Sequence, residues 1–131
     1  MADDLLAKTR ALQEQAARVG FDWPHISGVF EKLDEEIVEL AEAVEAGDAA
    51  QVRRELGDLM FSVVNLSRFL EACPSEELEA AGRRFEARIQ CVKARLEEQG
   101  RAIQDCSLEE LDEIWEQVKR ECRTTGGSGV A

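Results

Sequence analysis

Apolar residues recur at intervals of three and four along most of the chain, with polar and charged residues between them. On an α-helix this spacing gathers the apolar side chains on one side. The pattern predicts helices over residues 3–19, 29–46, 49–72, 75–99 and 108–122. We therefore expect an all-α fold, an antiparallel bundle of four main helices with an additional C-terminal helix. Residues 1–123 would form one helical domain, and residues 124–131 a flexible tail.

Glycine and capping residues mark the expected helix ends. Gly20 would end the first helix, and Gly47 would end the second. Asp48 and Gln51 have the spacing of a capping box at the start of the third helix, and Ser107 and Glu110 have it before the last. The connection at Gly47-Asp48 is so short that the helices on either side are expected to form an antiparallel hairpin.

Three apolar stripes would face the core. The first helix carries Leu5, Leu6, Leu12, Ala16 and Val19, the second carries Phe30, Leu33, Ile37, Leu40 and Val44, and the third carries Val52, Leu56, Leu59, Met60, Val63, Leu66 and Leu70. The third helix has further apolar residues, Phe61 and Val64, on its other sides. Such a helix is either central or covered by a second subunit, so a homodimer or higher homo-oligomer is expected.

Two acidic pairs are the strongest candidates for chemistry. Glu36 and Glu39 lie three residues apart on the second helix, as Glu55 and Asp58 do on the third. This spacing puts each pair on one helix face, and the hairpin would bring the pairs alongside each other. By helical projection Glu36 and Glu39 border the apolar face, whereas Glu35 points away from the core.

Two further features extend this candidate site. Glu55, Asp58, Ser62, Asn65 and Phe69 form a polar line on the third helix, which is either a pocket wall or a solvated face. The loop after Gly20 holds Phe21 and Trp23, which either stack on a base or plug the end of the bundle. The only histidine, His25, has no partner at metal-ligand spacing.

Composition narrows the possible partners. The 131-residue chain has a formal net charge of −12, which disfavours direct binding to nucleic acid and attracts divalent cations, although an acidic surface alone has the same charge. No apolar run is long enough to span a membrane. The four cysteines are widely scattered, as in a cytoplasmic protein with reduced thiols.

The residue types also restrict the chemistry. Carboxylate oxygens suit Mg²⁺, with Mn²⁺ as a substitute, better than zinc or copper. Di-iron bundles normally use Glu-x-x-His, which is missing here. There is no Gly-rich phosphate loop and no nucleophile–base motif. What remains is metal-assisted hydrolysis of a phosphoanhydride.

The acidic residues carry a family resemblance. Glu35-Glu36-Ile37-Val38-Glu39 followed by Glu55-Leu56-Gly57-Asp58 resembles the E-E-x-x-E … E-x-x-D signature of MazG-type all-α nucleoside triphosphate pyrophosphohydrolases. Further likeness, to the second domain of tandem-domain MazG proteins or to a single-domain MazG, lies in residues 20–24, 59–61, 64–68 and 114–119. In all, it covers roughly residues 12–121.

The resemblance implies Mg²⁺-dependent cleavage of nucleoside triphosphates to the monophosphate and pyrophosphate, in nucleotide-pool house-cleaning. By position it makes Glu36, Glu39, Glu55 and Asp58 metal ligands, with Glu35 and Glu39 catalytic and Glu35 orienting water. It also makes Asn65, Arg84, Arg88, Trp115 and Lys119 substrate-binding residues. Trp23 and Phe21 join them as rings that could stack on the base. Where the family has an Asn and a Lys, this chain has Gly82 and Arg84.

Two alternatives remain at this point. One is a narrow-specificity dUTP or dCTP pyrophosphatase of the same superfamily. The other is a non-catalytic, acidic helical oligomerisation module, in which the carboxylates are solvated and the basic residues of the fourth helix make ordinary surface ion pairs.

Overall fold

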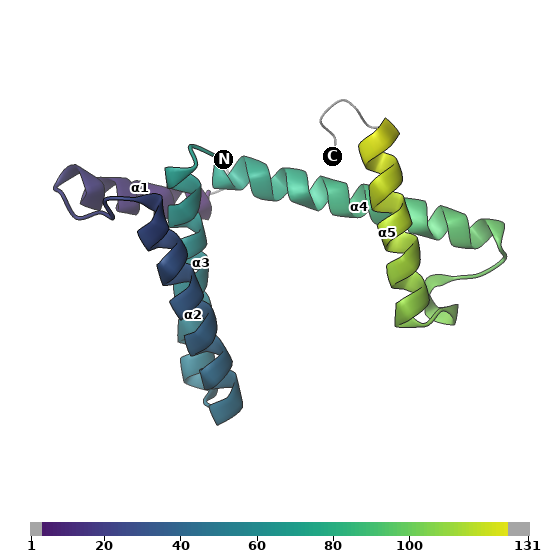
Figure 1. The fold of residues 1–131 in the computed structure, drawn as a ribbon, viewed down its shortest axis with the longest axis horizontal. Coiled ribbons are helices and arrows are strands. Elements are labelled where there is room, and N and C mark those ends of the chain that lie inside the picture. Colours follow the sequence, from purple (N-terminus) through teal and green to yellow (C-terminus); the bar gives the residue numbers. More distant parts are fainter. Residues whose placement is uncertain (1–3, 126–131) are drawn as a thin grey trace. The chain divides into compact units, whose positions relative to one another are not determined.

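The computed structural model describes residues 4–125 (Figure 1). Its elements are α1 (Leu5–Arg18), α2 (Ile26–Ala46), α3 (Ala49–Phe69), α4 (Pro74–Glu98), the 3₁₀ turn η1 (Ile103–Asp105) and α5 (Leu108–Thr125). The described part of the chain has no strand, which confirms the all-α class and the five helices expected from the apolar pattern. The C-terminal helix continues to Thr125, past the expected start of the tail at residue 124. Residues 126–131 of that tail lie outside the described residues.

The chain divides into two compact units. The N-terminal unit, Met1–Glu77, holds α1, α2, α3 and the first turn of α4, and the C-terminal unit, Leu78–Ala131, holds the rest of α4 with α5. Within residues 4–125 no helix is both long and apolar enough to cross a membrane.

The hairpin between α2 and α3 forms where the sequence places it. Gly47 ends α2 with a φ of 71°, a left-handed conformation that glycine adopts without steric cost. The Asp48 side chain accepts a hydrogen bond from the Gln51 N–H (3.1 Å) and caps α3. The Gln51 side chain does not complete the capping box, because the Asp48 N–H donates to the Ala43 carbonyl and Gln51 Oε1 accepts from Arg54. The two helices consequently run side by side, and α1 packs against α3 (Figure 1).

The interior of the N-terminal unit differs from the expected one. Its buried side chains include Gln13, Glu36, Glu55 and Ser62. The expected apolar stripes are largely exposed, with Leu5, Leu12 and Val19 of α1, Phe30, Ile37 and Val44 of α2, and Leu56, Met60, Val63 and Leu70 of α3 all open to solvent. The helices are therefore rotated about their axes from the expected orientation. The few buried apolar side chains, Val29, Ala43 and Val64, are small enough to let the backbones approach.

The C-terminal unit has an ordinary apolar core. Val92 and Leu96 of α4 pack with Val118 of α5, and Leu96 has no exposed surface. The capping box before α5 is complete, because the Glu110 N–H donates to Ser107 Oγ and the Ser107 N–H donates to Glu110, both at 3.1 Å. Here the sequence pattern and the buried face agree.

Candidate functional site

Three carboxylates meet between α2 and α3. Glu36 and Glu39 of α2 and Glu55 of α3 each offer an oxygen, and the three oxygens lie within 4.8 Å of one another. Glu36 is 3% exposed and Glu55 7% exposed, whereas Glu39 is open to solvent. The short hairpin explains the meeting of Glu39 with Glu55, because each lies eight residues from Gly47, and Glu36 lies three residues from Glu39 on the same side of α2.

The cluster has unsatisfied oxygens. Oε2 of Glu36 and Oε2 of Glu55 are buried, and no described residue donates a hydrogen bond to either atom. A buried carboxylate oxygen without a partner is unfavourable unless a cation or donor compensates it. Hard oxygen donors and two orphaned oxygens fit a divalent cation of the Mg²⁺ type.

The other oxygens of the two buried glutamates have partners. Lys32 Nζ lies 3.0 Å from Glu36 Oε1, an ion pair that raises the pKa of Lys32. Gln51 donates its side-chain amide to Glu55 Oε1. Burial, and next the carboxylate of Glu39, raise the pKa of Glu55 above its usual value. Lys32 is the only positive partner that the described contacts give these three acids, so negative charge dominates the cluster.

Two expected members lie outside this cluster. Asp58 is exposed on α3, almost one turn beyond Glu55, and Glu35 is exposed on α2. Among the described residues neither belongs to the group of acids close enough to share an ion. The roles of these two residues therefore remain predictions.

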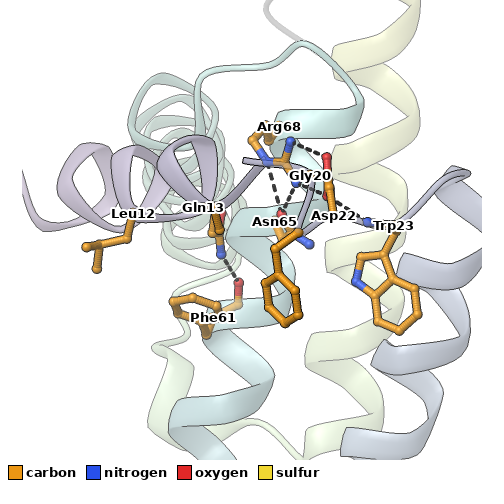
Figure 2. A pocket seen from close by; sticks show the side chains of 10 residues that line it. Leu12, Gln13, Gly20, Asp22, Trp23, Phe61, Asn65 and Arg68 are labelled. Carbon is orange, nitrogen blue, oxygen red and sulfur yellow. Dashed lines mark hydrogen bonds and ion pairs between the residues drawn. The ribbon is translucent and has the colours of Figure 1, made fainter. Parts of the chain in front are cut away.

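A cavity of about 410 Å³ lies beside the C-terminal half of α3. It is lined by α1, by the loop after Gly20 and by α3, and Phe21, Trp23 and Asn65 all contribute to it (Figure 2). The polar line of α3 thus borders a pocket at Asn65. The Trp23 ring lies so close to the start of α2 that a Cβ on Gly28 would come within 2.7 Å of it.

Arg68 ties the aromatic loop to α3. Its guanidinium donates two hydrogen bonds to the Asp22 carboxylate, at 2.6 and 3.0 Å, and two to Asn65 Oδ1, at 2.8 and 3.0 Å (Figure 2). The Arg68 hydrogen bonds hold the pKa of Asp22 below its usual value. Because the Asn65 oxygen is engaged, its NH₂ group is the part left to meet a ligand.

The expected phosphate-binding residues belong to the C-terminal unit. Arg84 and Arg88 are half-buried on α4, and Trp115 and Lys119 are half-buried on α5. The rings of Trp115 and Phe85 pack at a centroid distance of 5.4 Å, and Lys119 Nζ lies 3.5 Å from Glu116. These contacts bring the α4 and α5 residues of the expected set into one unit.

Sequence reasoning missed several residues of the site. They are Gln13, Asp22, Lys32, Gln51 and Arg68. Lys32 had a readable signal, because a lysine four residues before Glu36 lies on the same helix face. Gln13 had no such signal, because Glu14 and Gln15 follow it directly and are as polar as it is. The Arg68–Asp22 pair spans 46 residues and had no local signal.

Comparison with known proteins places the acidic cluster within a known domain family. Residues 26–85, which contain the acidic cluster, match the model of the MazG nucleotide pyrophosphohydrolase domain. A Thermotoga maritima protein, named nucleoside triphosphate pyrophosphohydrolase/pyrophosphatase MazG, is 43% identical over 114 residues, 87% of this chain and 44% of that protein. This chain belongs to the MazG family.

Two further relatives are less identical to this chain. The Escherichia coli K12 nucleoside triphosphate pyrophosphohydrolase is 36% identical over 120 residues, 88% of this chain and 45% of that protein. The uncharacterized protein YabN of Bacillus subtilis is 36% identical over 75 residues, 57% of this chain and 15% of that protein. The chain spans less than half the length of these curated relatives.

Proposed function

We propose that this MazG chain hydrolyses nucleoside triphosphates to nucleoside monophosphate and pyrophosphate, with Mg²⁺ or, as a substitute, Mn²⁺. The observation that carries the proposal is the meeting of Glu36, Glu39 and Glu55, two of them buried with an unpartnered oxygen. Such a cluster is unfavourable as a purely structural feature and becomes favourable when a divalent cation binds. The names of the T. maritima and E. coli relatives support the choice of reaction.

Each part of the site has a proposed task. Glu36, Glu39, Glu55 and Asp58 would hold the metal, which when bound neutralises phosphate charge and lowers the pKa of an attacking water. Glu39 and Glu35 are both exposed on α2, where they would orient the water and accept its proton. The water attacks phosphorus, and the bond between the α and β phosphates breaks to release pyrophosphate.

The substrate contacts would come from the remaining residues. Arg84, Arg88 and Lys119 supply positive charge for the phosphates in a chain of net charge −12, and arginine can bind phosphate with two parallel hydrogen bonds. Stacking on Phe21, Trp23 or Trp115 would hold the base. Nucleotide-pool house-cleaning is the expected role of such an enzyme.

The test is release of pyrophosphate from a panel of ribo- and deoxynucleoside triphosphates, with and without Mg²⁺. We expect metal-dependent release that Glu39→Gln and Asp58→Asn strongly reduce, with Glu42→Gln on the exposed side of α2 as the control. Activity confined to dUTP or dCTP would identify the narrow-specificity enzyme. No release from any nucleotide, or release unchanged in the variants, would contradict the proposal.

We also infer that a second copy of this chain covers the exposed apolar stripes of α1, α2 and α3. Monomeric proteins rarely leave so many large apolar side chains open, and a self-complementary surface closes as a dimer. Ile37→Glu on α2 should shift the mass in solution toward the monomer, whereas Glu45→Gln should not. A wild-type chain that is already monomeric at high concentration would contradict this inference.

The proposed location is the cytoplasm. The cysteines whose side chains the structure describes, Cys73, Cys91 and Cys106, form no disulfide. Unpaired thiols are usual in a reducing compartment, which supports the proposal.

A further inference from the structure

Gln13 is an unusual residue in the pocket beside Asn65. It is 7% exposed, the most buried polar side chain of α1, and it lines the cavity. Its Nε2 donates to the carbonyl oxygen of Phe61 at 2.9 Å (Figure 2). That bond fixes the orientation of the amide, because a carbonyl can only accept. Oε1 is thereby left as a buried acceptor to which no described residue donates.

The rest of the pocket suits a flat, aromatic ligand. Apolar surface dominates its walls, and the rings of Phe21, Trp23 and Phe61 contribute to them. Among the described residues that line it, those with amide or charged side chains are Gln13, Asp22, Asn65 and Arg68, of which Asp22 and Arg68 are hydrogen-bonded to each other. An apolar cavity with a few fixed polar groups is typical of a small-molecule site, in which the polar groups decide the orientation of the ligand.

The distance along α3 between the acidic cluster and the pocket suits the length of a nucleotide. Glu55 and Asn65 lie ten residues apart on the polar line of α3, a rise of about 15 Å. A nucleotide with its phosphates at the acidic cluster would have its base near Asn65 if it lay along this line. The base, rather than the phosphates, would then reach Asn65 and Gln13, which carry no charge.

We propose that this pocket is the nucleobase subsite and that Gln13 Oε1 accepts a hydrogen bond from an N–H group on the edge of the base. This inference rests on the proposed function, since it takes the substrate to be a nucleotide. Gln13 acts here as a specificity-determining residue. A base without an N–H donor would bury Oε1 unpaired, and a site that leaves a buried polar group unpaired rejects its ligand.

A matched pair of substrates tests the proposal in the wild-type chain. ATP carries an amino group on its base, and purine riboside triphosphate has hydrogen there and no N–H on the base. Measured beside GTP, CTP and UTP, purine riboside triphosphate should have a KM roughly ten-fold or more above the best natural purine nucleotide, with kcat nearly unchanged. An equal KM would overturn the proposal and would indicate that water satisfies Gln13 in the complex.

A variant then assigns the effect to Gln13. Gln13→Met keeps the size of the side chain and removes both polar atoms. It should raise the KM of the natural nucleotides and bring the KM ratio between purine riboside triphosphate and the best natural purine nucleotide close to one. Gln15→Met, at an exposed position two residues further along α1, should keep the wild-type ratio. A ratio that persists in a folded Gln13→Met chain would overturn the assignment, and the wild-type comparison stands if that variant does not fold.

A binding measurement separates this inference from the proposed hydrolysis. Without metal, whichever of AMP and GMP stabilises the wild-type chain more should raise its thermal midpoint above that reached with purine riboside monophosphate, and Gln13→Met should remove the difference. This result in a chain that hydrolyses no nucleotide would support the subsite and refute the hydrolysis. Hydrolysis without any discrimination in KM or binding would refute only the subsite.

Discussion

The two units of this chain differ in what they bury, because among the described residues large polar side chains are buried in one and not in the other. In the N-terminal unit the residues between the helices include Gln13, Glu36 and Glu55, while long apolar side chains such as Ile37 and Met60 lie open. In the C-terminal unit the residues between α4 and α5 are apolar, with Leu96 at the centre. Both units are built from amphipathic helices, so helix type does not explain the difference.

The two interiors contribute differently to the stability of the fold. Apolar burial contributes about 25 cal/mol per Å² to stability, so the core around Leu96 stabilises its unit directly. The carboxylates between α2 and α3 do not stabilise the fold in that way, because buried charges are desolvated. Under the proposed function, the N-terminal unit would hold a metal site where the C-terminal unit has its apolar core, and its exposed apolar residues would face a second copy of the chain.

The largest expected effect separates activity from stability. Glu55→Gln keeps the acceptor for Gln51 and removes a charge from the cluster. Because a metal ligand is lost, we expect pyrophosphate release to fall more than about 100-fold. The thermal midpoint of the metal-free chain should stay the same or rise, since repulsion from Glu39 is relieved.

Calorimetry and the pyrophosphate assay measure the two quantities on one preparation. Glu45→Gln, at an exposed position near the end of α2, is the control and should change neither. A lower midpoint in metal-free Glu55→Gln would show that the cluster is structural after all.

The second prediction concerns the apolar core of the C-terminal unit, where the expected change is a loss of stability. Leu96→Ala removes a side chain with no exposed surface and leaves a cavity, which should lower the free energy of unfolding by about 2–5 kcal/mol. Leu108→Ala, at a residue 82% exposed, should change it by less than about 0.5 kcal/mol. Chemical denaturation with amide hydrogen exchange in α4 and α5 measures both, and equal effects would contradict the assigned core.

The same contrast explains what the sequence could predict. Helix positions follow from apolar spacing and from local caps such as Gly47 and Asp48, so they are available from short segments. The meeting of Glu39 with Glu55 follows from the short hairpin, because the two residues lie equally far from Gly47. Which helix face is buried does not follow, because spacing alone assigns the apolar stripe to the core whether or not a second surface covers it.

The pocket shows a second limit. Asn65, Phe21 and Trp23 were predicted as substrate-binding residues, and the structure brings all three to one cavity. Arg68 and Asp22, which hold the loop in place, are far apart in sequence and of ordinary type. Contacts of this kind depend on the tertiary fold and cannot be predicted from the spacing of apolar residues along one helix.

A third prediction compares one glycine from each unit. At Gly28 an added Cβ would lie 2.7 Å from the Trp23 ring, so Gly28→Ala should displace the ring and destabilise the chain by about 1–2 kcal/mol. Gly82 on α4 has no heavy atom within 4 Å of the same position, and Gly82→Ala should stabilise by about 0.5–1 kcal/mol through helix propensity. Thermal melts give both signs, and a stabilising Gly28→Ala would show that Trp23 is not confined by the pocket.

The smallest expected effect concerns the Arg68–Asp22 ion pair at the rim of the pocket. Arg68 holds the pKa of Asp22 below its usual value, so the pair stabilises the folded state when Asp22 is ionised. The contribution is fully present above the unfolded pKa of about 3.9 and is lost as the pH falls through the lower, folded value. Since both side chains are partly exposed, Asp22→Asn should cost only about 0.5–1 kcal/mol at pH 7.

The sign of this effect can be checked by melting at several pH values. The difference in midpoint between wild type and Asp22→Asn should shrink as the pH falls from 5 toward about 2, because protonated Asp22 resembles the variant. Asp34→Asn, at an exposed position on α2, is the matched control and should not reproduce this difference. A gap that persists at the lowest pH would mean that the effect of Asp22→Asn does not come from the charge of Asp22, which would contradict the assigned role of the ion pair.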